Sequence, residues 1–385
     1  MFRQLKSQAI GAVLGICLSG PVFAQNADEV LRNLILGGAH AQDFAPTFLA
    51  QIPIESVQDV IDQVHALIGE PLVVEASDGQ FYIETKTHRA AGKLILDENQ
   101  KISTLWFDAP EPIPQDMETA LMQFNDLADK VSWLVLRDGQ VLSERAANTP
   151  MAVASAFKLG VLSVLAQDVK MGVRNWNDVV QLEARHKSLP TGELQNLPDG
   201  SPVTLHTAAA LMISISDNTA TDLLIDVLGR DRVSAALGLE TLLTTREFFA
   251  LKLDEAAQAD WLAADTPEAK AEIAAKAAQN LPASSVVPPY VPGLEWEVPV
   301  SHLCALIGPL ADLPLMEMGP GLAEPDNWAR VAYKGGSEPG VINFTTALLD
   351  DVGREVCVSV TLNNNGSIDM LAAGSAYRGV LAVLR

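Results

Sequence analysis

The sequence has 385 residues, of which 48% are hydrophobic, with a formal net charge of −22 and a sequence pI of about 4.5. Its length and apolar content predict two domains with large cores. So acidic a chain repels nucleic acid phosphates and anionic lipid, which excludes both as expected partners and favours chemistry on small molecules.

Residues 1–24 have the pattern of a signal peptide. Arg3 and Lys6 precede an apolar run over 9–18, and Val22-Phe23-Ala24 is typical of a cleavage site with small residues. The apolar run is too short to span a bilayer, so we expect removal of this segment and no membrane span. The mature protein is predicted to be periplasmic or secreted, from a bacterium.

Residues 27–110 are predicted to form a small α+β domain. Two helical segments precede four short strands that are separated by turns. The helices are expected at 27–37 and 56–68, and the strands at 71–76, 80–85, 88–96 and 101–107. Helices followed by a strand meander pack as layers around one core. A proline-rich linker and a helix, over 111–130, lead to the second domain.

Residues 131–385 are predicted to form a second α+β domain, in which an antiparallel sheet is combined with a helical lobe. Two hairpins supply the strands, at 131–145 across an Asp-Gly turn and at 341–362. A final helix over 368–384 backs the sheet. The helical lobe is expected to extend from about residue 155 to residue 308.

Ser155 and Lys158 open an apolar helical run and form a Ser-x-x-Lys string. Residues three apart share a helix face, so the hydroxyl and the amine are within reach of each other. A serine becomes a nucleophile when an adjacent base takes its proton, and a lysine becomes a base when burial or a second cation, here Lys334, lowers its pKa. Alone, the string also fits an ordinary helix start with a capping serine and a solvated lysine.

Ser216-Asp217-Asn218 is a short polar stretch within the mainly apolar segment 211–225. Buried polar groups without partners would each cost about 1–3 kcal/mol. Ser216 and Asn218 are therefore expected to face each other, the lysine, or a bound ligand. A helix cap with local turns is the alternative.

Lys334-Gly335-Gly336-Ser337 precedes a predicted strand. Its two glycines let the backbone approach a ligand closely. The main-chain N–H groups of Ser337 and Ser155 would then form an oxyanion hole, in which one donor is typically worth about 2.7–4 kcal/mol. In isolation the string also fits a plain loop before a strand.

The order of the three strings resembles the class A β-lactamase and penicillin-binding serine hydrolase superfamily, whose motifs are Ser-x-x-Lys, Ser-Asp-Asn and Lys-Thr-Gly. The resemblance covers 131–385 and includes the loop 190–200 before the second string. It implies a β-lactamase or transpeptidase-like fold. By this resemblance the nucleophile, proton acceptor, proton shuttle and carboxylate anchor are Ser155, Lys158, Ser216 and Lys334, and the substrate contacts are Asn218, Gly336 and Ser337.

Two departures from the family pattern bear on substrate and turnover. Gly335 stands where the family commonly has Thr, which removes a hydroxyl that would help to hold a carboxylate. The sequence also lacks the Glu-x-x-Leu-Asn loop, whose Glu activates the water that breaks the acyl-enzyme in class A β-lactamases. Glu247 lies at about the right place and is the candidate for this base. A helix cap or a salt bridge to Arg246 is the alternative.

The layout of residues 27–110 resembles the cone-shaped ketosteroid-isomerase-like domain that precedes the β-lactamase-like domain in the serine hydrolase of clavulanic-acid-pathway type. The resemblance rests on layout, and no isomerase site is carried over. A packing or partner-binding role is expected.

Cys304 and Cys357 remain after removal of the signal peptide. A disulfide can persist in an oxidising compartment, and two buried free thiols fit the sequence equally well. Neither cysteine has a His or Cys neighbour at metal-ligand spacing, so neither a metal nor another cofactor is expected.

The sequence thus predicts an exported serine hydrolase that acts through a Ser155 acyl-enzyme on a β-lactam, an ester or a related small acyl substrate. One alternative is a penicillin-binding or sensor-type protein that is acylated but turns over slowly or not at all. Another is an esterase or peptidase acting on cell-wall fragments, which the same strings would serve. Nothing in the sequence indicates the oligomeric state.

Overall fold

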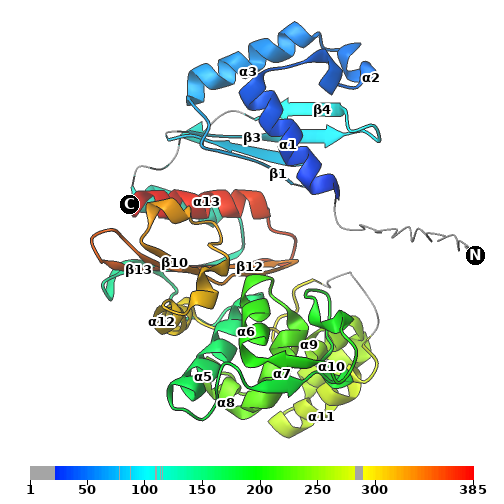
Figure 1. Cartoon of the computed structure of the whole chain (residues 1–385), viewed down its shortest axis with the longest axis vertical. Coiled ribbons are helices and arrows are strands. Elements are labelled where there is room, and N and C mark those ends of the chain that lie inside the picture. The colour runs from blue at the N-terminus through cyan, green and yellow to red at the C-terminus, as the bar shows by residue number, and fades with distance from the viewer. Residues whose placement is uncertain are drawn as a thin grey trace, which may run out of the picture. The chain divides into compact units, whose positions relative to one another are not determined.

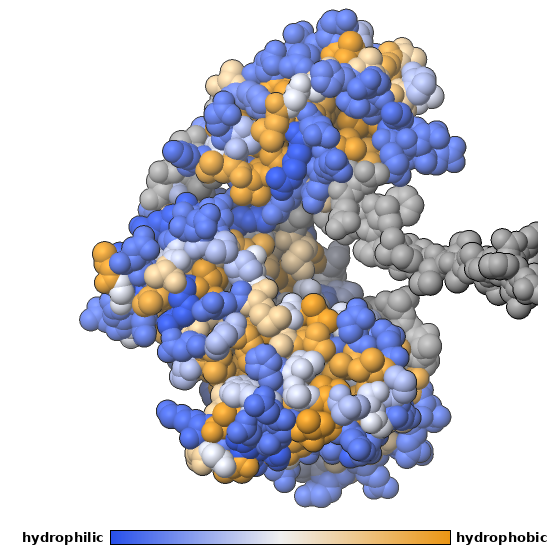
Figure 2. Space-filling view, viewed as in Figure 1, coloured by the Kyte–Doolittle hydropathy of each residue, from blue (hydrophilic) through white to orange (hydrophobic). Residues whose placement is uncertain are grey.

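The computed structural model describes residues 22–385 except 78, 87, 109–110, 113, 115 and 282–288. It divides into two compact units, Met1–Ile113 and Pro114–Arg385 (Figure 1). Most of the predicted signal peptide and part of the predicted linker lie outside the described residues. Hydrophilic residues cover much of the visible surface of each unit (Figure 2), in keeping with the net charge of −22. No helix in the described part of the chain has the length and apolar character that a membrane span requires.

The first unit packs helices against an antiparallel sheet, which confirms the predicted α+β class. Its helices are α1 (Val22–Gly37), η1 (Ala41–Asp43), α2 (Pro46–Leu49) and α3 (Ile54–Ile68), and its strands are β1 (Val73–Ser77), β2 (Gln80–Glu84), β3 (His88–Leu96), β4 (Ile102–Phe107) and β5 (Glu111–Pro112). The sheet order is β1-β2-β3-β4, and β5 pairs with β3. Leu31, Ile61 and Phe81 bring α1, α3 and β2 into one core, and each is at most 1% exposed.

The second unit contains the larger antiparallel sheet. Its strands are β6 (Lys130–Arg137), β7 (Gln140–Arg145), β10 (Arg330–Tyr333), β11 (Gly336–Glu338), β12 (Val341–Leu349) and β13 (Glu355–Asn363). The order is β10-β12-β13-β6-β7, and β11 also pairs with β12. Both predicted hairpins are present, and Asp138 and Gly139 have the positive φ angles, 51° and 75°, that such a tight turn requires.

Helices cover both faces of this sheet (Figure 1). On one face lie α4 (Met117–Met122), η2 (Gln123–Asp126) and α13 (Met370–Val383), whose Tyr377 is fully buried. The predicted helix of the linker region is therefore shorter than expected, since Asp116 caps α4 at its start and the chain turns into a 3-10 helix after Met122. On the other face lies α12 (Val300–Leu310), which borders the helical lobe.

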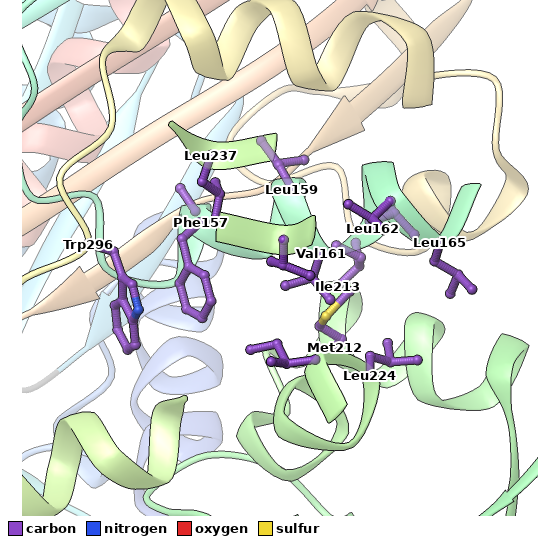
Figure 3. Close-up of a cluster of buried hydrophobic side chains, with 14 of the residues drawn as sticks. Phe157, Leu159, Val161, Leu162, Leu165, Met212, Ile213, Leu224, Leu237 and Trp296 are labelled. Carbon is purple, nitrogen blue, oxygen red and sulfur yellow. The ribbon is translucent and has the colours of Figure 1, made fainter. Parts of the chain in front are cut away.

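The helical lobe is built around α5 (Lys158–Lys170), which is apolar on almost every side. Around it lie α6 (Leu205–Ser214), α7 (Asn218–Leu228), α8 (Arg230–Leu237), α9 (Thr245–Leu253), α10 (Glu255–Ala263) and α11 (Pro267–Ala278). The remaining short elements are η3 (Ala154–Phe157), β8 (Val179–Gln181), η4 (Ala184–His186), η5 (Leu194–Asn196), β9 (Pro202–Thr204), η6 (Pro314–Met318) and η7 (Pro325–Asn327). Figure 3 shows Leu162 and Leu165 of α5 beside Met212 of α6 and Leu224 of α7. Because close packing on most sides holds α5 in place, the position of its first turn is fixed as well.

Cys304 of α12 and Cys357 of β13 form a disulfide, with an S–S distance of 2.02 Å. The sequence leaves open a disulfide or two buried free thiols, and the structure contains the disulfide. It ties the helical lobe to the sheet across 53 residues of chain. A cross-link of this kind typically stabilises a fold by about 2–4 kcal/mol.

Candidate active site

Ser155 lies on a short 3-10 turn, η3, directly before α5. The turn is held from both sides, because Val153 N–H donates to the carbonyl of Trp296 and the ring of Phe157 stacks on the Trp296 indole at 4.1 Å. Ala154 has a left-handed φ of 43°, which is uncommon for a residue with a side chain. Ser155 itself is only half-buried. The fold thus presents its hydroxyl from a rigid turn at the start of a buried helix.

Lys158 is completely buried one turn after Ser155. Its Nζ lies 3.0 Å from Ser216 Oγ, 2.6 Å from the Ser216 carbonyl oxygen and 2.7 Å from Asn218 Oδ1. Burial, and then the charge of Lys334, hold the pKa of the Lys158 ammonium well below its ordinary value. The predicted meeting of the first and second strings is therefore present, and the amine has the environment that a general base needs.

Ser216 sits between α6 and α7 with a left-handed φ of 58°. The next residue, Asp217, caps α7 by accepting from Ala220 N–H at 2.8 Å, and it also accepts from the N–H groups of Glu193 and Leu194. The buried carboxylate is thus satisfied by three main-chain donors, and it fixes the backbone that presents Ser216 and Asn218.

Asn218 links this turn to the loop that precedes α6. Its side-chain amide donates to the carbonyl of Leu189 at 3.0 Å, and its main-chain N–H donates to the carbonyl of Thr191 at 3.0 Å. The Thr191 hydroxyl in turn donates to the Ser216 carbonyl at 3.0 Å. The loop 190–200, which precedes the second string in the sequence, therefore holds Ser216 and Asn218 in place through hydrogen bonds of Thr191.

Lys334 reaches the site from the opposite side, out of the edge of the sheet. Its Nζ lies 3.2 Å from Ser216 Oγ and 2.7 Å from the carbonyl oxygen of Gly335. Burial lowers the pKa of the Lys334 ammonium to about 7. Two buried lysines therefore converge on the hydroxyl of Ser216, one from each of the outer strings.

Gly336 brings β11 against the turn that carries Ser155. A Cβ placed on Gly336 would lie 2.4 Å from Ser155 N and 2.3 Å from the carbonyl oxygen of Val153, so the strand and the turn meet through backbone alone. Ser337 follows on this strand, which among the described strands pairs with β12. The predicted oxyanion-hole donors, Ser155 N–H and Ser337 N–H, thus come from two backbone segments in close contact.

The side chain of Glu247 is engaged at the start of α9. One carboxylate oxygen accepts from Thr244 N–H in a capping box at the start of α9, and the other forms an ion pair with Arg230 at 2.7 Å. Arg246, the partner suggested by the sequence, donates instead to two main-chain carbonyls, of Ala278 and Lys187. The structure therefore gives Glu247 the roles of a cap and an ion-pair partner.

A buried cluster of Lys252, Glu295 and Glu338 was not predicted from the sequence. Lys252 Nζ lies 2.8 Å from Glu295 Oε1 and 3.0 Å from Glu338 Oε2, and all three side chains are at most 4% exposed. Glu338 is two residues after Gly336 on β11, so the two positions are on the same face of the strand. The sequence places Glu338 directly after the third string, which is the one feature that could have pointed to this cluster. Lys252 and Glu295 lie far from it along the chain, so no local pattern connects the three residues.

The polar groups gathered here are hydroxyls, amines, one amide and main-chain donors, which suit acyl transfer to a serine. Within the described residues, no group of three or more His, Cys, Asp or Glu side chains is arranged to hold a metal ion.

Comparison with known proteins bears on this site and on the fold. Residues 115–289 match the family model described as the Beta-lactamase enzyme family. No curated protein matches the sequence. The described fold is similar to that of a mutant class A β-lactamase of the last common ancestor of Gram-negative bacteria, at 15% identity, with a TM-score of 0.50 and coverage of 70% of this chain and 97% of that one.

Two other solved structures give similar coverage. A β-lactamase from Sphaerobacter thermophilus is 22% identical, with a TM-score of 0.49, and covers 70% of this chain and 95% of its own. A mutant of PBP-A, solved as an acyl-enzyme complex with penicillin G, is 15% identical, with a TM-score of 0.47, and covers 70% and 97%. The likeness to the ancestral β-lactamase, with its TM-score of 0.50, shows the fold alone, which is β-lactamase-like. The ketosteroid-isomerase-like character of residues 27–110 stays a prediction.

Proposed function

We propose that this chain is a serine hydrolase in which Ser155 attacks an acyl substrate and becomes acylated, a proposal that the match of residues 115–289 to the model of the Beta-lactamase enzyme family supports. The observation that carries the proposal is the convergence of Lys158 and Lys334 on Ser216 Oγ, at 3.0 and 3.2 Å. Two buried amines joined through one hydroxyl make a path along which a proton can move between nucleophile and leaving group.

In the proposed acylation, neutral Lys158 accepts the proton of the Ser155 hydroxyl while Ser155 Oγ bonds to the substrate carbonyl carbon. The negative charge that develops on the carbonyl oxygen is held by the N–H groups of Ser155 and Ser337. When the bond from carbonyl carbon to leaving group breaks, Ser216 gives its proton to the leaving group and is reprotonated from Lys158. The low pKa of the Lys158 amine, caused first by burial, supports its role as the acceptor.

Hydrolysis of the acyl-enzyme would need a base that activates water, and the contacts of the site bear on which group could serve. In the described part of the chain, the amines of Lys158 and Lys334 have serine, asparagine and main-chain oxygens as their hydrogen-bond partners. The carboxylate of Glu247 is engaged by Thr244 and Arg230. These contacts favour the second candidate function, a penicillin-binding or sensor-type protein that is acylated quickly and deacylated slowly.

We further propose that the protein is exported, on the strength of the pattern in residues 1–24. The substrate proposed is a β-lactam, an ester or a related acyl compound, and cell-wall fragments belong to the same chemical class. No nucleic acid partner is proposed, because the net charge is −22.

Labelling with a fluorescent penicillin, followed by intact mass spectrometry, tests the acylation. Ser155→Ala should abolish the adduct. Ser163→Ala is the matched control, because the Ser163 hydroxyl bonds to the Gly160 carbonyl within the same helix, and this variant should label as the wild type does. Labelling that survives in Ser155→Ala, or no adduct with penicillins, cephalosporins and activated esters, would overturn the proposal.

Burst kinetics separate the two candidate functions. One equivalent of product followed by near-zero turnover supports the slowly deacylating protein, whereas sustained turnover supports the hydrolase. The measurement uses the mature full chain, and product release is followed at several enzyme concentrations so that the burst amplitude can be compared with the amount of Ser155 adduct.

A further inference from the structure

Three segments of the second unit meet at the buried cluster of Lys252, Glu295 and Glu338. Lys252 lies near the end of α9, Glu295 in the chain that leads to α12, and Glu338 at the last position of β11. Lys252 Nζ lies 2.8 Å from Glu295 Oε1 and 3.0 Å from Glu338 Oε2. One ammonium therefore joins a helix of the lobe, the chain before α12 and a short strand of the sheet.

The chain after Glu295 is paired with the chain that leads to the candidate nucleophile. Residues 296–298 lie antiparallel to residues 151–153, and main-chain hydrogen bonds of 2.9 and 3.0 Å join them. The indole of Trp296, the residue after Glu295, also stacks on the ring of Phe157 (Figure 3). A displacement of Glu295 would therefore reach the nucleophile's turn through its own neighbours in sequence.

β11 carries the other half of the candidate oxyanion hole. The strand is three residues long, and Ser337, whose N–H is one of the two expected donors, directly precedes Glu338. The next residue, Pro339, accepts a hydrogen bond from Tyr290 N–H at 2.9 Å. The end of β11 is thus held to the chain around Glu295 through the cluster and through a main-chain hydrogen bond.

The cluster holds these segments at a fixed spacing because it is removed from water. The side chains of Lys252 and Glu295 are 0% exposed, and that of Glu338 is 4% exposed. Burial, and then the neighbouring Glu295, raise the pKa of Glu338 above its ordinary value, which favours one shared negative charge opposite one ammonium. Buried ionic groups keep their partners, because an unpaired one is costly. The lengths of the three side chains therefore set the distance between the segments.

We infer that Lys252, Glu295 and Glu338 position the oxyanion hole, by setting the place of the Ser337 N–H relative to the Ser155 N–H. Their effect is exerted through the backbone, so they are positioning residues. The inference rests on the proposed function and adds to it the group that aligns the two donors. Loss of one donor of such a hole typically costs about 10²–10³ in rate, so a displaced donor should slow acylation measurably.

The readout is the stretching frequency of the acyl carbonyl in the Ser155 adduct, measured by infrared difference spectroscopy on the mature full chain. Hydrogen bonds from the hole polarise this carbonyl and lower its frequency, so a displaced donor raises the frequency. The probe is benzylpenicillin with a heavy carbon isotope at the reacting carbonyl, or p-nitrophenyl acetate labelled in the same way where benzylpenicillin gives no adduct. Acylated protein alone contributes to the band, so partial misfolding of a variant does not move it.

Glu338→Leu removes the carboxyl group from Lys252 and keeps an apolar side chain of similar size. It should move the band to higher frequency and slow acylation by about tenfold or more. Glu338→Gln keeps the length and an oxygen that can accept from Lys252, so it should keep the wild-type band and acylate within about threefold of the wild-type rate. Where Glu338→Leu yields no folded protein, Glu338→Asp replaces it, because its shorter side chain should shift the band in the same direction.

Asp168→Leu is the matched control for the loss of a buried carboxylate. Asp168 is 1% exposed in the second half of α5 and pairs with Arg174 at 3.2 Å and with Arg232 at 2.5 Å. This variant should lower the melting temperature and keep both the band and the acylation rate of the wild type.

The outcomes are separable from those of the proposed function. If neither probe acylates Ser155 in the wild type, the proposed function fails, and this inference fails with it. If the wild type is acylated and the Leu and Asp variants of Glu338 keep its band and rate, the inference alone is overturned. An equal shift of the band in Asp168→Leu would also overturn it, because a shared effect indicates general loosening of the fold. A band of Glu338→Gln displaced as far as that of Glu338→Leu would do the same, because the retained hydrogen bond would then not align the hole.

Discussion

Lys158 and Lys334 lie on opposite sides of one hydroxyl, with their Nζ atoms 3.0 and 3.2 Å from Ser216 Oγ. They are separated widely along the chain and arrive from α5 and from the edge of the sheet. Each is almost completely removed from water, at 0% and 4% exposure. Burial disfavours both positive charges, and the charge on either lysine also disfavours that on its neighbour.

This arrangement predicts how acylation depends on pH. Burial and the charge of Lys334 lower the pKa of Lys158, so removing that charge in Lys334→Met should raise the pKa of Lys158. A base acts when deprotonated, so acylation rises with pH through the pKa of Lys158, and in the variant this rise should move to higher pH. The rate with a neutral ester, measured against pH, tests this.

Lys187→Met is the control for the charge change, because Lys187 pairs with Asp199 at the surface of the lobe, at 2.8 Å. Its pH profile should coincide with that of the wild type. A profile of Lys334→Met that also coincides with the wild type would show that Lys334 does not set the pKa of Lys158.

The local parts of the fold and site were predictable from sequence, because short-range signals determine them. The Asp138-Gly139 turn and the start of α5 at Lys158 depend on residues within a few positions. The ion pair of Glu247 could not be predicted from such local signals. Its nearest oppositely charged neighbour in sequence is Arg246, yet its partner is Arg230, 17 residues earlier, because α8 and α9 bring the two side chains together. Such long-range contacts are fixed by tertiary packing, which a sequence pattern does not encode.

The placement of Glu247 predicts that Glu247→Gln leaves turnover unchanged. Glutamine can keep the cap on α9, since Gln is accepted in a capping box, so the main loss is the ion pair with the partly exposed Arg230. Glu247 is buried, and a hydrogen bond to a charged group is typically worth about 1.5–3 kcal/mol. Chemical denaturation should show a loss in this range, and Arg230→Met should produce no further loss in the Glu247→Gln background. A fall in steady-state turnover of tenfold or more would instead make Glu247 the deacylating base.

The buried cluster of Lys252, Glu295 and Glu338 predicts a second pH dependence, in stability. Burial, and then the neighbouring Glu295, raise the pKa of Glu338 above its ordinary value of 4.5. Above pH 4.5 the folded state therefore holds a proton that the unfolded state has released, so stability falls as pH rises through this window. Glu338→Gln removes the titration and should flatten that part of the curve of unfolding free energy against pH.

Lys252→Met is the companion variant for this cluster. It removes the ammonium that lies 2.8 and 3.0 Å from Glu295 and Glu338 and leaves the negative charge that the two carboxyl groups share buried without a countercharge. Removing one partner of a buried ionic group typically costs about 3–5 kcal/mol. The loss should therefore exceed that in Glu338→Gln, as measured by urea denaturation at pH 7. Equal losses in the two variants would contradict the view that the lysine neutralises the pair.

Gly192 supplies the sharpest test of how the second string is positioned. Its φ is 126°, and a Cβ there would lie 2.4 Å from Cγ of Asp217, whose carboxylate holds the start of α7. Gly192→Ala should therefore displace Asp217 and, through it, Ser216.

Gly172→Ala is the matched control, since Gly172 also has a positive φ, of 71°, but no heavy atom within 4 Å of its Cβ position. Both variants should lose about 1 kcal/mol from backbone strain, and only Gly192→Ala should lose acylation of Ser155 as well. If the two variants label at the same rate, contact between Gly192 and Asp217 does not position the site, and the carboxylate can move without shifting the Ser216 hydroxyl from the two lysines.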